Sequence, residues 1–123
     1  MKKLLFALIL LSCSTKQDDP SPNLLIGNWR NIGGFNANCV NPSQNSTLKT
    51  SSSNSVYSFT DKEFTYSGTL FSYSGTYTIK GDSILMPILR AIGIDKRKFK
   101  VIDNDLYLIL RTGGCDANNV YKK

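Results

Sequence analysis

Gly75-Thr76-Tyr77-Thr78-Ile79-Lys80-Gly81-Asp82-Ser83-Ile84 contains the clearest strand and turn signals of the chain. In its first half, apolar side chains alternate with threonines, which is the period-two pattern of a β-strand with one buried face. Gly81-Asp82 then separates this run from a second apolar run at 83–89. A Gly-Asp pair between two such runs predicts a two-residue hairpin of type II′ or I′, and therefore two antiparallel strands.

The strand pattern extends in both directions from this hairpin. Further strands are predicted at 24–30, 57–59, 64–70, 73–79, 97–103, 106–111 and 120–121, with turns at 61–62, 104–105 and 112–116. Pro87 suggests that its strand lies at an edge or carries a bulge. Hairpin connections imply antiparallel pairing, and almost no helix is expected. The sequence therefore predicts an all-β domain, a meander of seven to eight strands that forms a small barrel or a two-sheet sandwich.

Positions 33–55 interrupt this pattern. They are rich in Asn, Ser, Thr and Gly and contain Cys39. A loop of this length is unusual in a compact domain, and such loops are either functional or flexible. Both interpretations stay open on the sequence alone.

The amino terminus has the pattern of an export signal. Met1-Lys2-Lys3 is basic, and positions 4–11 form an unbroken apolar run. A helix of that length rises about 12 Å, far less than the roughly 30 Å of a bilayer core, so the run suits a secretory signal. Leu10-Leu11-Ser12-Cys13 resembles the lipobox of bacterial lipoproteins. The resemblance implies a signal peptide at 1–12, cleavage after Ser12 and lipidation of Cys13.

Acylation at Cys13 would hold the protein at a membrane, because several acyl chains on one residue make an effectively permanent anchor. Positions 13–23 are polar, contain two prolines and predict a flexible tether. Their lysine and adjacent acids resemble the surface-export signal of lipoproteins from the Bacteroides and Flavobacterium group. We therefore expect an outer-membrane lipoprotein that is exposed on the cell surface or faces inward.

The cysteine count depends on this anchor. If Cys13 carries lipid, Cys39 and Cys115 remain as an even pair in an oxidising compartment. They predict a disulfide that closes a long loop and contributes roughly 4 kcal/mol. The alternative is two unpaired thiols, because a sequence does not show whether two Cα atoms come within bridging distance.

The chain has no histidine. This removes the usual general base and the commonest metal ligand, so we expect no enzyme, no metal site and no cofactor. The formal net charge of +6 includes Lys2 and Lys3 of the signal and indicates no nucleic-acid partner. We expect a monomer whose partners are the membrane, reached through the lipid anchor, and a small apolar ligand.

Several short motifs occur in the order seen in a known family. They are Leu25-Ile26-Gly27-Asn28-Trp29-Arg30, the hairpin at 75–84, Asn104-Asp105-Leu106-Tyr107-Leu108 and Val120-Tyr121-Lys122-Lys123. In this order they resemble successive strands of lipocalin-like lipoproteins from the Bacteroides and Flavobacterium group. The resemblance implies that 24–123 is a lipocalin-like β-barrel domain whose interior holds a small ligand. META domains are a second family with a similar strand pattern, but their Gly-Cys-Asn motif is missing here, since 70–74 contains no cysteine.

Aromatic residues on the predicted strands are the candidates for lining a ligand pocket. They are Trp29, Tyr57, Phe59, Phe64, Tyr66, Tyr73, Tyr77 and Phe99. The same residues could instead fill a plain hydrophobic core. Tyrosines suit a pocket better than phenylalanines, because each buried hydroxyl needs a partner.

Two functions remain open on this basis. The first is binding of a small apolar or amphiphilic ligand in the cell envelope. The second is a ligand-free structural or protein-interaction module of the envelope. The basic cluster Lys96-Arg97-Lys98 with Lys100 is interpreted as a solvated strand face that discourages edge pairing, and contact with anionic lipid or polysaccharide is the alternative.

Overall fold

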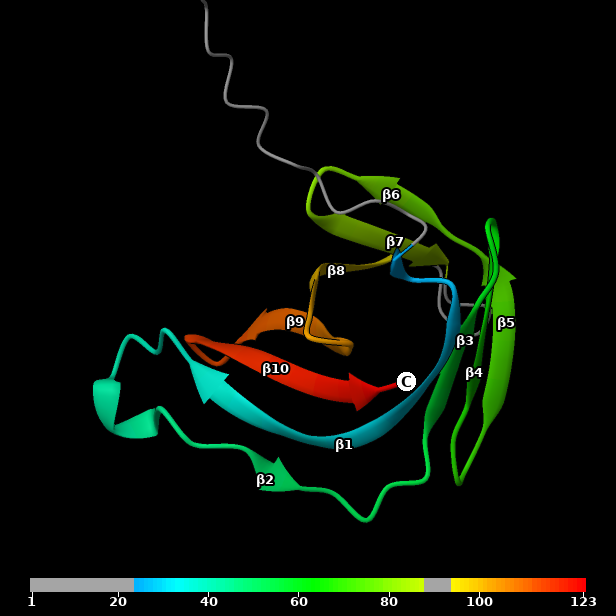
Figure 1. The fold of residues 1–123 in the computed structure, drawn as a ribbon. Coiled ribbons are helices and arrows are strands. Elements are labelled where there is room, and N and C mark those ends of the chain that lie inside the picture. Colours follow the sequence, from blue (N-terminus) through cyan, green and yellow to red (C-terminus); the bar gives the residue numbers. More distant parts are fainter. Residues whose placement is uncertain (1–23, 88–93) are drawn as a thin grey trace, which may run out of the picture.

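A computed structural model of the chain describes residues 24–87 and 94–123 (Figure 1). The predicted signal peptide, the lipidation site Cys13 and the tether lie outside the described residues. The elements are β1 (Gly27–Ala37), the 3-10 helix η2 (Pro42–Gln44), β2 (Lys49–Thr50), β3 (Val56–Phe59), β4 (Glu63–Ser67), β5 (Ser72–Thr76), β6 (Thr78–Lys80), β7 (Ser83–Pro87), β8 (Ile94–Ile102), β9 (Asp105–Thr112) and β10 (Cys115–Lys122).

The ten strands form one sheet in the order β5-β4-β3-β1-β10-β9-β8-β7-β6, with β2 paired to β1, and every pairing is antiparallel. The sheet curls until β5 contacts β7, so it nearly closes into a barrel (Figure 1). The predicted all-β antiparallel barrel is therefore confirmed, with a strand count slightly above the expected seven to eight.

One extra strand arises because the predicted run at 73–79 breaks at Tyr77. Its backbone N–H donates to the Lys62 carbonyl at 3.0 Å, and its hydroxyl donates to the Thr60 carbonyl at 2.6 Å. The chain therefore leaves β5 at one edge of the sheet and starts β6 at the other edge. This step brings the two edges of the barrel together.

The tight turns follow the backbone conformations that the strands need. Lys80 pairs with Ser83, so Gly81-Asp82 is the predicted two-residue hairpin, and a positive φ of 61° at Gly81 alone fits type II′. The next turn lies one residue earlier than predicted. It uses Asp103-Asn104, which have φ of 52° and 63°, so Asp105 already belongs to β9.

The predicted loop at 112–116 is also a two-residue turn. Thr112 pairs with Cys115, which leaves only Gly113-Gly114 between β9 and β10. The last strand therefore starts at Cys115, well before the predicted 120–121. Its middle is rich in asparagine, which disfavours strands locally, and pairing with β1 and β9 on both sides overrides that preference.

Strand β1 also exceeds its prediction and runs on to Ala37, because Gly33 to Ala37 pair with β10. The predicted loop at 33–55 is therefore wrong at its start, and it is further broken by η2 and β2. Gly33 has a φ of 150°, and a Cβ there would collide with the Lys49 carbonyl. Glycine at this position lets β2 approach β1.

The interior of the barrel has an apolar, filled half. It is built from Leu25, Trp29, Phe59, Phe64, Tyr77, Ile84, Met86, Phe99, Leu106 and Leu108, all of them buried. Trp29 is 1% exposed, and its indole N–H donates to the Leu25 carbonyl at 2.6 Å. The segment before β1 is thereby fixed across this end of the barrel.

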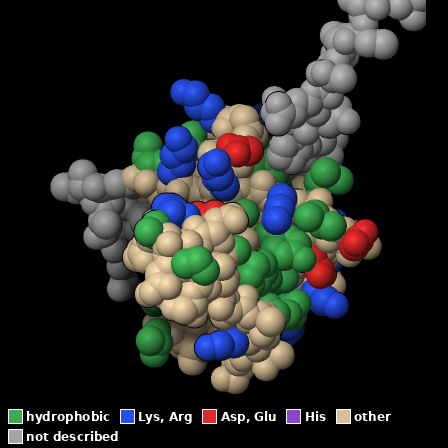
Figure 2. All heavy atoms as spheres, turned by 90° about the vertical axis from the view of Figure 1, so that its left-hand side faces the viewer, with side chains coloured by type: hydrophobic (Ala, Val, Ile, Leu, Met, Phe, Trp, Pro, Cys, Tyr) green, Lys and Arg blue, Asp and Glu red, His purple; other side chains and the backbone are tan. Residues whose placement is uncertain are grey.

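Side chains along β8 point alternately into the barrel and outward. Asp95, Arg97 and Phe99 are buried or half-buried, whereas Lys96 and Lys98 are exposed. Figure 2, which views the molecule from the side of η2, shows basic side chains gathered together with acidic ones beside them. The lysines form the predicted solvated face, but Arg97 points the other way, into the barrel. The predicted role against edge pairing is wrong, because β8 pairs with β7 on one side and with β9 on the other.

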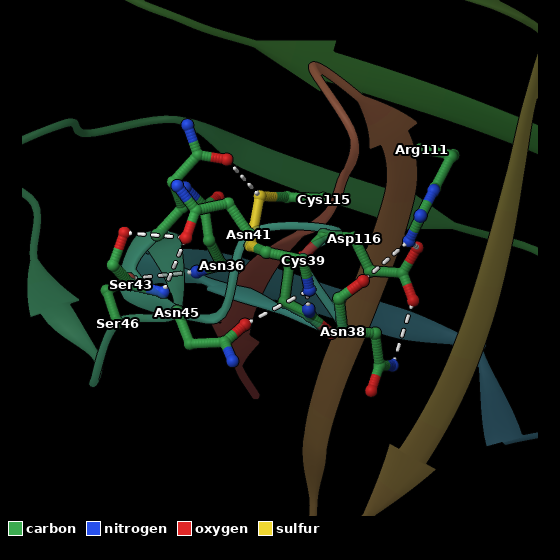
Figure 3. Close-up of a disulfide and its surroundings, with 12 residues drawn as sticks. Asn36, Asn38, Cys39, Asn41, Ser43, Asn45, Ser46, Arg111, Cys115 and Asp116 are labelled. Carbon is green, nitrogen blue, oxygen red and sulfur yellow. Dashed lines mark hydrogen bonds and ion pairs between the residues drawn. A yellow bond between two sulfur atoms is a disulfide. The ribbon is translucent and has the colours of Figure 1, made fainter.

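The disulfide between Cys39 and Cys115 is present, with Cα atoms 4.0 Å apart (Figure 3). The predicted pairing is thus confirmed. It joins the segment after β1 to the start of β10. Nearby, Asp116 accepts hydrogen bonds from Asn38 at 2.9 Å and from Arg111 at 3.0 Å. The long segment between β1 and β3 is therefore held against the barrel at its first residues.

Candidate functional site

A hollow of about 350 Å³ lies inside the barrel, at the end that carries the β4–β5 turn. It is lined by Asn31, Ser51, Ser53, Ser55, Tyr57, Tyr66, Phe71, Tyr73, Arg97, Asn119 and Tyr121. The lining strands include β4 and β8, which are far apart in the sheet order. Because both face the same space, the hollow reaches into the barrel interior, and the exposed residues Ser51, Ser53 and Phe71 mark its open mouth. Its volume lies at the small end of the range for ligand pockets.

Aromatic rings form one wall of this hollow. The ring centroids of Tyr57 and Tyr66 lie 4.9 Å apart, those of Tyr66 and Tyr73 lie 5.1 Å apart, and Tyr57 meets Tyr121 edge-on at 5.4 Å. Phe71 stacks on Tyr73 at 5.9 Å. These contacts fix the rings in the spacing that aromatic pairs prefer, so the wall is preformed.

Two hydroxyls of this wall, those of Tyr57 and Tyr121, are held in the protonated state. Burial raises the pKa of Tyr57, and its 3.3 Å hydrogen bond with Tyr73 adds to that effect, while the nearby Arg97 guanidinium opposes it. Burial likewise raises the pKa of Tyr121 to about 12. At neutral pH both residues therefore keep an O–H group that donates hydrogen bonds.

Among the described residues that line the hollow, Arg97 is the charged one. Its side chain is 21% exposed, and its Nε donates to Asp95 Oδ2 at 2.8 Å, with the Asp95 side chain 12% exposed. A buried charge is tolerated when it is paired in this way. Asp95 does not line the hollow. It therefore holds Arg97 through Nε on the side away from the cavity, and the rest of the guanidinium faces the cavity.

The mouth of the hollow is completed by the segment that precedes β3. Ser51 donates its backbone N–H to the Ile32 carbonyl at 3.1 Å, and Asn31 donates to the Ser55 carbonyl at 2.9 Å. Ser53 and Ser55 are joined through their hydroxyls at 3.0 Å. The end of the predicted long loop therefore packs along β1 and contributes serines to the site.

The predicted ligand-binding residues divide between two places. Tyr57, Tyr66 and Tyr73 line the hollow. Trp29, Phe59, Phe64, Tyr77 and Phe99 are buried in the filled core, outside the hollow's lining. The structure therefore groups the tyrosines of this set, except Tyr77, at the cavity and the phenylalanines in the core.

Sequence reasoning missed the polar members of the site. Arg97 could have been found, because it lies two residues before Phe99 and so shares its inward face of a strand. Asn31, Asn119 and the serines carry no such signal, since polar residues are expected in loops and on outer faces. Asn31 and Asn119 are positioned by the pairing of β1 with β10, and the serines by backbone hydrogen bonds of the 51–55 segment to β1, neither of which the local pattern predicted.

Other hollows lie outside the barrel. One of about 480 Å³ is bordered by Lys96, Lys98 and Arg111 together with Asp82 and Asp116. Lys98 and Asp82 form an ion pair at 3.5 Å whose side chains are 67% and 62% exposed. Exposed pairs of this kind contribute little, and the surface is best described as solvated.

Within 24–87 and 94–123, no cluster of three or more His, Cys, Asp or Glu side chains is placed to hold a metal ion. In the same part of the chain, no helix has the length and apolar character needed to cross a membrane. No family model, curated protein or solved structure matches the chain.

Proposed function

We propose that this protein is a lipid-anchored envelope protein whose barrel binds a small amphiphilic ligand. The anchor is supported by the basic start, the short apolar run and the lipobox ending at Cys13. An outer-membrane location follows from the resemblance to lipocalin-like lipoproteins. The anchor would keep the binding domain close to a source of amphiphilic molecules.

The observation that carries the binding proposal is the division of the barrel interior. One half is filled by apolar side chains, whereas the other half contains a hollow lined by tyrosines and by an arginine that is paired with Asp95. Polar groups inside a barrel cost free energy unless they are satisfied, so a ligand with polar atoms suits this half better than a purely apolar one.

The rim of the hollow supplies apolar surface for the other part of such a ligand. Leu70 and Phe71 lie in the turn between β4 and β5 and are 91% and 52% exposed. Phe71 also lines the hollow. A ligand with its polar group inside would therefore extend its hydrocarbon part past these side chains toward the outside.

The alternative, a ligand-free structural or protein-interaction module, is favoured by the filled apolar half of the barrel. The two functions differ in what a blocked hollow does. Blocking it abolishes ligand binding in the first case and changes nothing in the second.

The test uses Ser53→Trp, which places a large ring at the mouth of the hollow, and Ser52→Trp as the matched control. Both serines are exposed, but Ser52 is outside the lining. Purified wild-type protein and the control should bind a neutral fluorescent amphiphile and release it to competing amphiphiles, whereas Ser53→Trp should not. Equal binding by both variants would place the probe elsewhere, and no binding by the wild-type protein would refute the proposal.

A further inference from the structure

The inward position of Arg97 calls for a reason, because a charged side chain is rarely placed inside a barrel without a role. The side chain is 21% exposed, against 67% for Lys98 on the outer face of the same strand. Burying a guanidinium carries a desolvation cost that pairing with one carboxylate only partly offsets. An outward lysine would avoid this cost, so the buried arginine indicates a role inside the barrel.

Asp95 occupies only one of the nitrogens of Arg97. The ion pair runs through Nε, and no described residue accepts a hydrogen bond from the two terminal nitrogens. Within the described residues, no side-chain nitrogen or oxygen is both fully buried and without a partner. The terminal nitrogens therefore have accessible surface, and since Arg97 lines the hollow, that surface faces the cavity.

The other polar groups near Arg97 are hydroxyls and carboxamides, which can both donate and accept hydrogen bonds. The hydroxyls of Tyr57 and Tyr121 stay protonated, as their raised pKa values indicate. No carboxylate is among the described residues that line the hollow. Guanidinium N–H groups are donors only, and they match carboxylate, phosphate or sulfate oxygens in a planar fork. Arg97 therefore favours a ligand that supplies acceptors, and the lining places no carboxylate in competition with it.

We propose that Arg97 is the specificity-determining residue of the hollow and that it binds the anionic head of a small amphiphile, with Asp95 as its positioning residue. The head accepts hydrogen bonds from the terminal nitrogens of Arg97 and from the hydroxyl of Tyr121. The carbon skeleton packs against the tyrosine wall and leaves past Phe71. This inference rests on the proposed function and adds the chemical class of the ligand.

The test compares two probes that differ only in the head group, octanoate and octanamide, by calorimetric titration of the purified wild-type protein at 0.15 M salt. Charge-assisted hydrogen bonds to a desolvated arginine are worth enough to favour octanoate by at least about tenfold. Equal affinities would overturn the anionic assignment while leaving the binding proposal intact. Binding of neither probe would also overturn it, and the neutral fluorescent amphiphile would then decide the proposed function separately.

Three variants test whether Arg97 is the source of the preference for octanoate over octanamide. The double variant Asp95→Asn/Arg97→Gln removes both charges without leaving one unpaired, and it should lose the preference for octanoate. Arg97→Lys should keep part of it, because the charge remains but the fork is lost. Lys98→Gln removes the same charge from the outer face and should keep all of it. A preference that survives the double variant, or that disappears in Lys98→Gln, would contradict the role of Arg97.

Discussion

Removing the disulfide, by the double variant Cys39→Ala/Cys115→Ala, should lower the free energy of unfolding by about 4 to 5 kcal/mol. The cysteines are 76 residues apart in the sequence. Loop-closure entropy for a ring of that size amounts to about 4.5 kcal/mol at 25 °C. Because a domain of this size has a total stability of about 5–15 kcal/mol, the bridge accounts for a large share of it.

The loss is measurable by urea unfolding followed through the fluorescence of Trp29, the sole tryptophan, which is 1% exposed in the folded barrel. Because the free energy of unfolding decreases by about 2 kcal/mol per molar urea, the midpoint of unfolding should fall by about 2 M. Wild-type protein treated with a reductant serves as a matched comparison and should shift by a similar amount.

The same variant also shows whether the disulfide orders positions 38–55 in addition to stabilising the whole domain. The bridge ties the segment that starts at Asn38 to β10, and the end of that segment supplies Ser51, Ser53 and Ser55 to the hollow. Amide exchange in positions 38–55 should therefore rise more than exchange in β9. A midpoint that falls by less than about 0.5 M would refute the loop-closure argument, and unchanged exchange in 38–55 would refute the anchoring of the segment.

Three further outcomes are expected. Asp95→Ala leaves Arg97 buried without its partner and should cost about 3–5 kcal/mol in urea unfolding, so a loss under about 1 kcal/mol would show that the pair is effectively solvated. Burial raises the pKa of Tyr57 and that of Tyr121, the latter to about 12. In the unfolded chain tyrosine ionises near pH 10, so the free energy of unfolding is unaffected by these two residues below pH 10. Above pH 10 it falls by about 1.4 kcal/mol per pH unit for each residue, until the tyrosines of the folded protein ionise as well. A urea midpoint that stays constant from pH 9 to 11.5 would contradict this. Cys13→Ala should abolish labelling with radioactive fatty acid and release the protein from the membrane fraction, and persistent labelling would disprove the anchor.

The fold was largely predictable because alternation along single strands is a local signal. The hairpin at Gly81-Asp82 and the strand runs around it required only a period of two and the conformational preferences of turn residues. The failures concern long-range pairing. Strand β1 continues through glycines and asparagines that have low strand preference, because β10 pairs with it along that length. Nothing local to positions 33–37 indicates this.

The site was predictable only in part, for the same reason. Tyr57, Tyr66 and Tyr73 could be named from their alternation, but alternation does not tell a filled core from a hollow one. That difference depends on which residues meet across the barrel, and here Arg97 meets tyrosines instead of aliphatic side chains. The inward face of Arg97 was present in the pattern of β8 and was obscured by the lysines on either side.

Two-dimensional NMR titration with octanoate and, separately, with octyl glucoside shows whether the polar half of the barrel is a binding site. We expect at least one of these amphiphiles to shift the side-chain signals of Tyr57, Tyr73 and Arg97 saturably, while those of Ile84 and Leu106 in the filled core stay in place. Shifts confined to exposed residues such as Leu70, or no saturable shifts with either amphiphile, would contradict it.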